Sequence, residues 1–99
     1  MNKESIRSHL HTHCLGRKRA ASSLSLEKLM NISGNELRKQ VNALRREGVP
    51  IASGAEGYFY AETAAEVYGT IRSLQKMRRG LDAAITGLEQ ALGSFGESS

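Results

Sequence analysis

The middle of the chain carries a row of amide and basic side chains at the spacing of one helix face. Asn35, Arg38, Lys39 and Asn42 stand at i, i+3, i+4 and i+7, positions that are neighbours on the surface of an α-helix. In the major groove of a DNA duplex, asparagine can pair through two hydrogen bonds with adenine, and arginine with guanine. A helix over this segment would therefore place hydrogen-bonding groups suited to base edges on one side.

Further cations stand on either side of this row and predict a different chemistry. Lysine and arginine neutralise phosphates and position a protein on nucleic acid without reading its sequence. We predict phosphate contacts from Arg45 and Arg46, which follow the row, and from Arg17, Lys18 and Arg19, which precede it. The run at 17–19 fits an ordinary flexible basic loop equally well.

The distribution of charge points to a polyanionic partner for the first half of the chain. Residues 1–48 hold ten lysines and arginines against four acids, a net charge of +6, whereas residues 49–99 hold four against six, a net charge of −2. Such an asymmetry is typical of nucleic-acid binding by the basic half, although a solvated surface can carry the same charges.

The other reactive side chains form no catalytic or metal-binding pattern. His9 and His13 share a face of the first predicted helix, but His11 points away from them and Cys14 lies on the apolar stripe. A structural zinc site needs four convergent ligands. No nucleophile elbow and no phosphate-binding glycine loop is present. We therefore predict no enzymatic activity, no metal and no cofactor.

Length and composition limit the class of protein. The 99 residues are 39% hydrophobic and 24% charged, which is typical of one small globular domain. No apolar run approaches the roughly 18 residues of a membrane helix, and the polar N-terminus does not resemble a signal peptide. The single cysteine fits a reducing compartment. We expect a soluble protein of the cytoplasm without a membrane partner.

Two short helices are predicted before the row. Residues 3–14 place Ile6, Leu10 and Cys14 on one helical stripe, and Gly16 then introduces a basic loop over residues 17–23. A second helix is expected from about Ser25, with Leu26, Leu29 and Met30 as its buried edge, and residues 31–34 connect it to the third.

The third helix, over residues 33–48, has the clearest local signals. Ser33 and Glu36 match a capping box, in which each side chain bonds the other residue's backbone N–H. Gly48 supplies the glycine that commonly follows a helix. Between them, the apolar residues fall on the face opposite the amides and cations: Leu37, Val41 and Leu44.

A hairpin and a long helix complete the predicted elements. Strand-like runs at 49–52 and 58–61 flank a glycine-rich turn, with Pro50 at a strand start or edge. The fold class is therefore mainly α with a small β-hairpin, a winged helix-turn-helix followed by a long C-terminal helix. We divide the chain into a winged helix-turn-helix domain (1–61), a C-terminal helix for dimerisation (62–92) and a flexible tail (93–99).

The stretch from Ser25 to Ala61 resembles the winged-helix domain of the biotin-operon-repressor type. The similar features are Ile32-Ser33, the sequence Glu36–Ile51 with its Gly-Val-Pro-Ile end, and the Gly57-Tyr58 that opens the return strand. This covers a little over a third of the chain. Small stand-alone proteins of this kind resemble those of phages and prophages, which implies DNA binding in a bacterial host cell and no ligase activity.

One departure from the family pattern concerns the tip of the hairpin. Many wings carry arginine or lysine there, but this one carries Glu56 and no base. An acidic tip does not hold phosphate. Either the wing stays away from DNA or the module contacts proteins.

The C-terminal helix carries an apolar stripe with alternating spacings of four and three residues, as in a coiled coil. Its members are Val67, Ile71, Leu74, Arg78, Leu81, Ile85, Leu88 and Leu92. The stripe could pack back on the first helix, or it could pair with a second copy. About 30 helical residues span roughly 45 Å, which is longer than a winged-helix core. We therefore favour a homodimer through the distal half of this helix. The residues expected at this interface are Leu74, Leu81, Ile85, Leu88 and Leu92.

Two features of that helix stay open at this point. Arg78 on the stripe favours antiparallel pairing beside an acid or a kink at that position. Gly80 is a candidate break.

From these features we expect a dimeric, sequence-specific protein that binds double-stranded DNA and regulates transcription in a phage or mobile element. The alternative is an adaptor whose winged helix and coiled coil dock on a replication or transcription protein. The acidic wing and the apolar stripe favour the adaptor, and the basic, amide-bearing helix face disfavours it.

Overall fold

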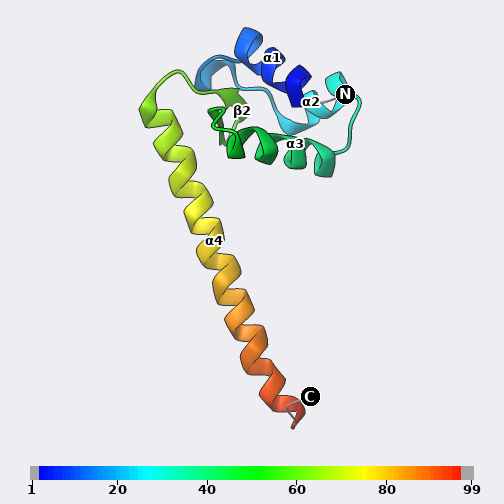
Figure 1. Cartoon of the computed structure of the whole chain (residues 1–99), viewed down its shortest axis with the longest axis vertical. Helices are drawn as coiled ribbons and strands as arrows, with labels where there is room; N and C mark the ends of the chain where they lie inside the picture. Colours follow the sequence, from blue (N-terminus) through cyan, green and yellow to red (C-terminus); the bar gives the residue numbers. More distant parts are fainter. Residues whose placement is uncertain (1–2, 97–99) are drawn as a thin grey trace.

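The computed structural model describes residues 3–96 and shows a head of short helices and a hairpin, from which one long helix extends (Figure 1). The elements are α1 (Lys3–His13), η1 (Arg17–Arg19), α2 (Ser23–Met30), α3 (Gly34–Arg46), β1 (Ile51–Gly54), β2 (Gly57–Tyr60), α4 (Ala64–Leu92) and η2 (Gly93–Phe95). The mainly helical fold with a small hairpin and a long C-terminal helix is confirmed.

Helix α2 begins at Ser23, earlier than expected, because Ser22 caps it. The Ser22 hydroxyl accepts a hydrogen bond from the Ser25 N–H at 3.1 Å. Leu26 and Met30 are buried as predicted, but Leu29 is 54% exposed, so its assignment to the buried edge is wrong. In a helix Leu29 lies about 80° from the line through Leu26 and Met30, and only that line faces the core.

Helix α3 forms where its caps and stripe predict it. The Ser33 hydroxyl accepts from the Glu36 N–H at 3.1 Å, as the capping box predicts. The predicted return bond is corrected, because the Glu36 carboxylate accepts from the Gln40 side-chain amide at 2.9 Å instead. The chain leaves the helix through Gly48, whose φ of 89° lies in the left-handed region that glycine adopts without strain.

The core of the head lies between the three helices and the hairpin. Each element contributes one apolar face to this core. Because short helices are marginal in water on their own, it is this packing that stabilises them. Its buried members are Ile6, Leu10, Cys14, Leu26, Met30, Leu37, Val41, Leu44, Ile51, Ala52 and Phe59.

The hairpin has a third segment beside it that the sequence did not predict. Strands β1 and β2 are antiparallel, with Gly54 opposite Gly57. On the free edge of β2, Ala21 and Tyr58 exchange two backbone hydrogen bonds of 2.9 Å. The expected exposed loop over 17–23 is thus tied to the sheet at Ala21. At Gly57 a Cβ would lie 2.1 Å from the Ala21 carbonyl oxygen, so only glycine fits.

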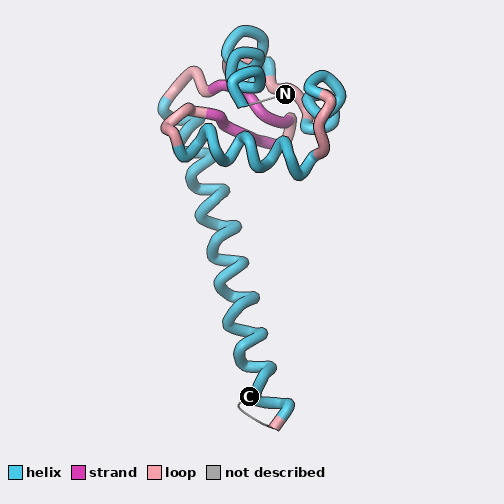
Figure 2. Tube along the Cα trace, turned by 45° about the vertical axis from the view of Figure 1, so that its right-hand side comes forward, coloured by secondary structure: helices cyan, strands magenta, loops and turns pink. Residues whose placement is uncertain are grey.

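Helix α4 is continuous through Gly80 and leaves the head instead of packing back along α1 (Figure 2). Thr63 caps it, and near its start Thr70 is buried against β1, where its hydroxyl accepts from the Ser53 N–H at 3.1 Å. From residue 71 onward every described side chain is exposed. The radius of gyration is 17.1 Å, compared with about 13 Å for a compact chain of 100 residues.

At the start of the predicted flexible tail, residues 93–95 form the short 3-10 turn η2. Residues 97–99 of that prediction lie outside the described residues.

Among the helices within residues 3–96, none has the length and apolar character needed to cross a bilayer.

Candidate nucleic-acid interface

Helix α3 brings the predicted row together on one exposed face. Asn35, Arg38, Lys39 and Asn42 are all exposed, and the buried stripe of the same helix anchors them to the core from the other side. The Arg38 guanidinium donates to the Asn35 side-chain oxygen. Two of the row's side chains are therefore already held side by side in the free protein.

The two arginines after the row lie in different environments. Arg46 is exposed. Arg45 turns toward the hairpin, where Nε donates to the Ile51 carbonyl oxygen at 2.8 Å and Nη2 donates to the Ser53 hydroxyl at 3.2 Å. Burial lowers the pKa of the Arg45 guanidinium. The expectation that Arg45 stands on the outer face is corrected, since β1 begins close enough to accept its hydrogen bonds.

The basic segment η1 is exposed but fixed to the start of α4. The Arg17 N–H donates to Glu66 Oε2 at 3.1 Å, and the Glu62 N–H donates to Oε1 of the same carboxylate at 2.7 Å. These backbone hydrogen bonds, that from Glu62 first, lower the pKa of Glu66. The cations Arg17, Lys18 and Arg19 therefore sit on an ordered turn instead of a loose loop.

The two groups of cations do not form one patch. Segment η1 packs against β2, whereas α3 packs against α1, α2 and β1. In Figure 1, α3 runs along the lower edge of the head, and the blue loop that follows α1 lies at its upper left. A ligand touching both would have to extend across the head.

The tip of the hairpin carries no cation. Ala55 and Glu56 form the turn between Gly54 and Gly57, and both are exposed. The acidic side chain expected at the hairpin tip is therefore exposed to solvent.

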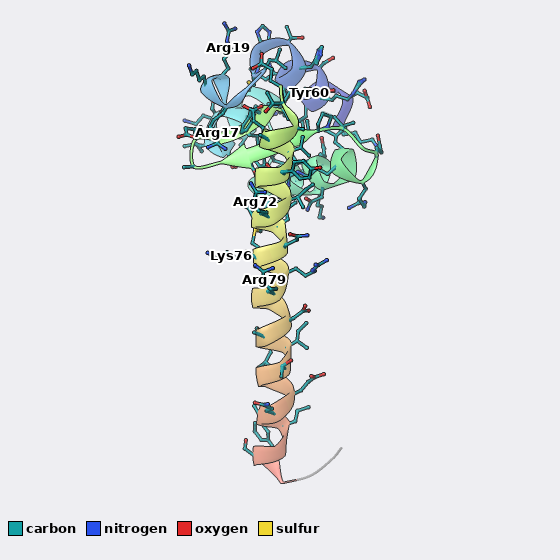
Figure 3. All side chains as sticks on the ribbon, turned by 90° about the vertical axis from the view of Figure 1, so that its left-hand side faces the viewer. Arg17, Arg19, Tyr60, Arg72, Lys76 and Arg79 are labelled. Atoms are coloured by element: carbon teal, nitrogen blue, oxygen red, sulfur yellow. The ribbon has the colours of Figure 1, made fainter. Side chains whose placement is uncertain are left out.

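Helix α4 carries a second basic row that was not predicted, on a face away from its apolar stripe. Arg72, Lys76 and Arg79 stand at i, i+4 and i+7, and all are exposed. Figure 3 shows them on the near side of α4, below Arg17 of the head. With 100° per residue they lie on the face opposite the stripe. The same spacing rule that found the row on α3 would have found this one.

The histidines of α1 do not converge. The rings of His9 and His13 lie 5.0 Å apart, while His11 packs edge-on against Tyr60 at 4.7 Å. Burial and the neighbouring His13 lower the pKa of His9. Over residues 3–96, no cluster of three or more potential metal ligands is found.

Comparisons with family profiles, curated proteins and solved structures give no match to this chain. Its function has to be inferred from the arrangement of its own residues.

Proposed function

We propose that this chain is a winged helix-turn-helix protein that binds double-stranded DNA sequence-specifically, acts as a homodimer and regulates transcription in a phage or mobile element. The observation that carries the proposal is the single exposed face of α3, on which Asn35, Arg38, Lys39 and Asn42 stand together.

The order of elements supports this use of α3. Three helices are followed by a hairpin, and α3 presents its polar face outward while α1 and α2 cover its apolar one. A major groove about 12 Å wide admits one α-helix. In helix-turn-helix proteins the second helix of the motif enters that groove.

The residues of α3 then divide by role. Asn35, Arg38, Lys39 and Asn42 read base edges, and Arg46 contacts phosphate from the end of the helix. Arg45 keeps the hairpin against α3, which fixes the angle at which α3 is presented. Arg17, Lys18 and Arg19 contact phosphates of DNA that passes along the η1 side of the head.

The dimer rests on α4. The side chains Leu74, Leu81, Ile85, Leu88 and Leu92 are exposed on one face of a helix that projects from the head. An apolar stripe at a and d positions is the pattern that a second helix covers in a coiled coil. Repression would be steric, with the bound dimer occluding its site.

The proposal is tested by titrating random-sequence duplex DNA with the full chain over a salt series, with the mass in solution recorded. We expect binding in the micromolar range that weakens steeply with salt, because each neutralised phosphate adds about −0.9 to the slope of log K against log salt. No binding at low salt would reject DNA as the partner.

The second candidate is a protein-protein adaptor. The acidic Glu56 at the hairpin tip and the exposed stripe of α4 favour it. An adaptor need not show salt-dependent DNA binding, so the same titration separates the two functions.

A further inference from the structure

The stripe of α4 is a large apolar surface that residues 3–96 of the chain leave uncovered. Leu81 is 66% exposed and Leu88 is 70% exposed, and α4 extends well beyond the head (Figure 2). Isolated helices are marginal in water even with favourable sequences. Gly80 and Gly87 each weaken this one by about 1 kcal/mol relative to alanine. The distal half of α4 therefore needs a cover.

A groove lies between the head and the N-terminal end of α4, which we call its root. Its volume is about 330 Å³, and its apolar walls are Val49, Pro50 and Ile51 from the head and Val67, Ile71 and Leu74 from α4. A dry cavity of about 150 Å³ already accepts a benzene-sized group. Because Val67, Ile71 and Leu74 belong to the stripe, the groove and the stripe form one continuous surface.

We propose that two copies of this chain pair antiparallel through α4, and that Leu88 and Leu92 of each copy occupy the groove of the other. The inference rests on the dimer of the proposed function and not on DNA binding.

The spacing of the stripe fits this arrangement along its whole length. In an antiparallel pair the a positions of one helix face d positions of the other. Ile71 then faces the partner's Leu88, Leu74 faces the partner's Ile85, and Val67 faces the partner's Leu92. The residues that line the groove are therefore matched with the apolar residues of the far end.

Charge selects the antiparallel direction. Residues 72–79 carry Arg72, Lys76, Arg78 and Arg79 without an acid, whereas residues 81–92 carry Asp82 and Glu89 without a base. Of these cations only Arg78 lies on the stripe, and antiparallel pairing brings it next to the partner's Asp82, whereas Arg72, Lys76 and Arg79 stay on the outer face. Parallel pairing would set Arg78 against its own copy on the seam, where like charges repel.

The partial cover of the stripe near the head also favours antiparallel pairing. The head covers part of the stripe there, since Ile71 is 41% and Leu74 is 37% exposed, compared with 70% for Leu88. A parallel pair would bring a second head to this crowded end and leave both grooves empty. An antiparallel pair places only the side chains of Leu88 and Leu92 in each groove.

Disulfide trapping in the full chain tests the direction. Ile71→Cys protein is mixed with tagged Leu88→Cys protein and oxidised. We expect the mixture to form the mixed dimer at least 10-fold more than either variant links to itself. In the antiparallel pair, like positions are about 25 Å apart along the axis, whereas a disulfide needs Cα atoms within about 7 Å. The buried Cys14 makes wild-type protein the background control. Efficient self-linking of each variant would overturn the proposal in favour of a parallel pair.

A charge at the helix end tests the groove. Leu92→Glu should raise the dimer dissociation constant at least 10-fold by sedimentation, and Val49→Glu in the groove wall should do the same. Gln90→Glu adds the same charge on the opposite face and should change it less than 3-fold. Equal effects of the Leu92 and Gln90 variants, or a monomeric wild type at 100 µM, would overturn the proposal. Trapping needs no DNA, so a trapped dimer that fails to bind DNA would refute only the regulator.

Discussion

Two adjacent arginines of like charge show how position determines the role of a residue. Arg45 donates to a main-chain carbonyl and a hydroxyl of β1, while Arg46 extends into solvent. A buried acceptor that loses its donor costs about 1–3 kcal/mol, whereas a free surface cation contributes little to folding.

We therefore expect Arg45→Ala to lower the free energy of unfolding by about 1–3 kcal/mol in urea titrations. Arg46→Ala should change it by less than about 0.5 kcal/mol. In DNA binding, Arg46→Ala should reduce the salt slope by about one. An unfolding free energy that is equal for the two variants would contradict the role assigned to Arg45.

The base reading that we propose for the α3 face is a separate property from phosphate contact. Asn42→Ala or Arg38→Ala should reduce the discrimination between a selected site and random DNA by about 1–3 kcal/mol per lost base contact. Lys76→Ala removes a charge from α4 and should leave discrimination unchanged. If the α3 variants weaken binding equally on all sequences, these side chains contact phosphate instead.

At the scale of elements, the sequence predicted best where all signals are local. Helix α3 has its cap at Ser33, its stripe from Leu37 to Leu44 and its end at Gly48 within one short stretch, and the structure follows them. The row on its outer face follows from the same periodicity, so the exposed position of these residues could also be predicted.

What could not be predicted depends on contacts between distant segments. The bridge between Ala21 and Tyr58 leaves no periodic signal, because one pair of residues makes it. The inward turn of Arg45 depends on where β1 lies, and the tie between η1 and α4 depends on one carboxylate, Glu66.

The hydrogen bond from the Arg17 N–H to the Glu66 carboxylate gives a prediction for η1. Glu66→Gln keeps the shape of the side chain but removes its charge, so protection of the Arg17 and Glu62 amides from hydrogen exchange should fall. The lowered pKa of Glu66 means that the ionised form favours the folded state. Its contribution is present above the ordinary value of 4.5 and lost as pH falls through the lowered one.

Protection factors at the two amides, measured from pH 7 downward, should therefore decline in the wild type and stay flat in the variant. Backbone amides of the α3 core, such as that of Val41, serve as internal control. Protection that is unchanged in Glu66→Gln would show that η1 is held by β2 alone.

The whole molecule measures 56 × 30 × 23 Å because a head and a rod are joined at one end. In the proposed antiparallel dimer the roots of the two α4 helices would lie about 45 Å apart, and the twofold axis would run across the rod. Both α3 faces could then approach one side of a duplex, where half-sites recur every 34–36 Å or multiples of that distance. The proposed dimer should therefore bind an inverted repeat.

The length of α4 should consequently set the spacing between half-sites. Inserting seven residues after Gly80 preserves the spacing of the stripe and increases the distance between the two heads by about 10 Å. Selection from a library of inverted repeats should then no longer favour the wild-type spacing, because 10 Å is not a multiple of the 34–36 Å at which half-sites face the same side of the duplex. Inserting two residues turns the distal stripe by about 200° and should abolish dimer binding. In a parallel dimer both heads sit at the same end, so an unchanged spacing after the seven-residue insertion would exclude the antiparallel arrangement on DNA.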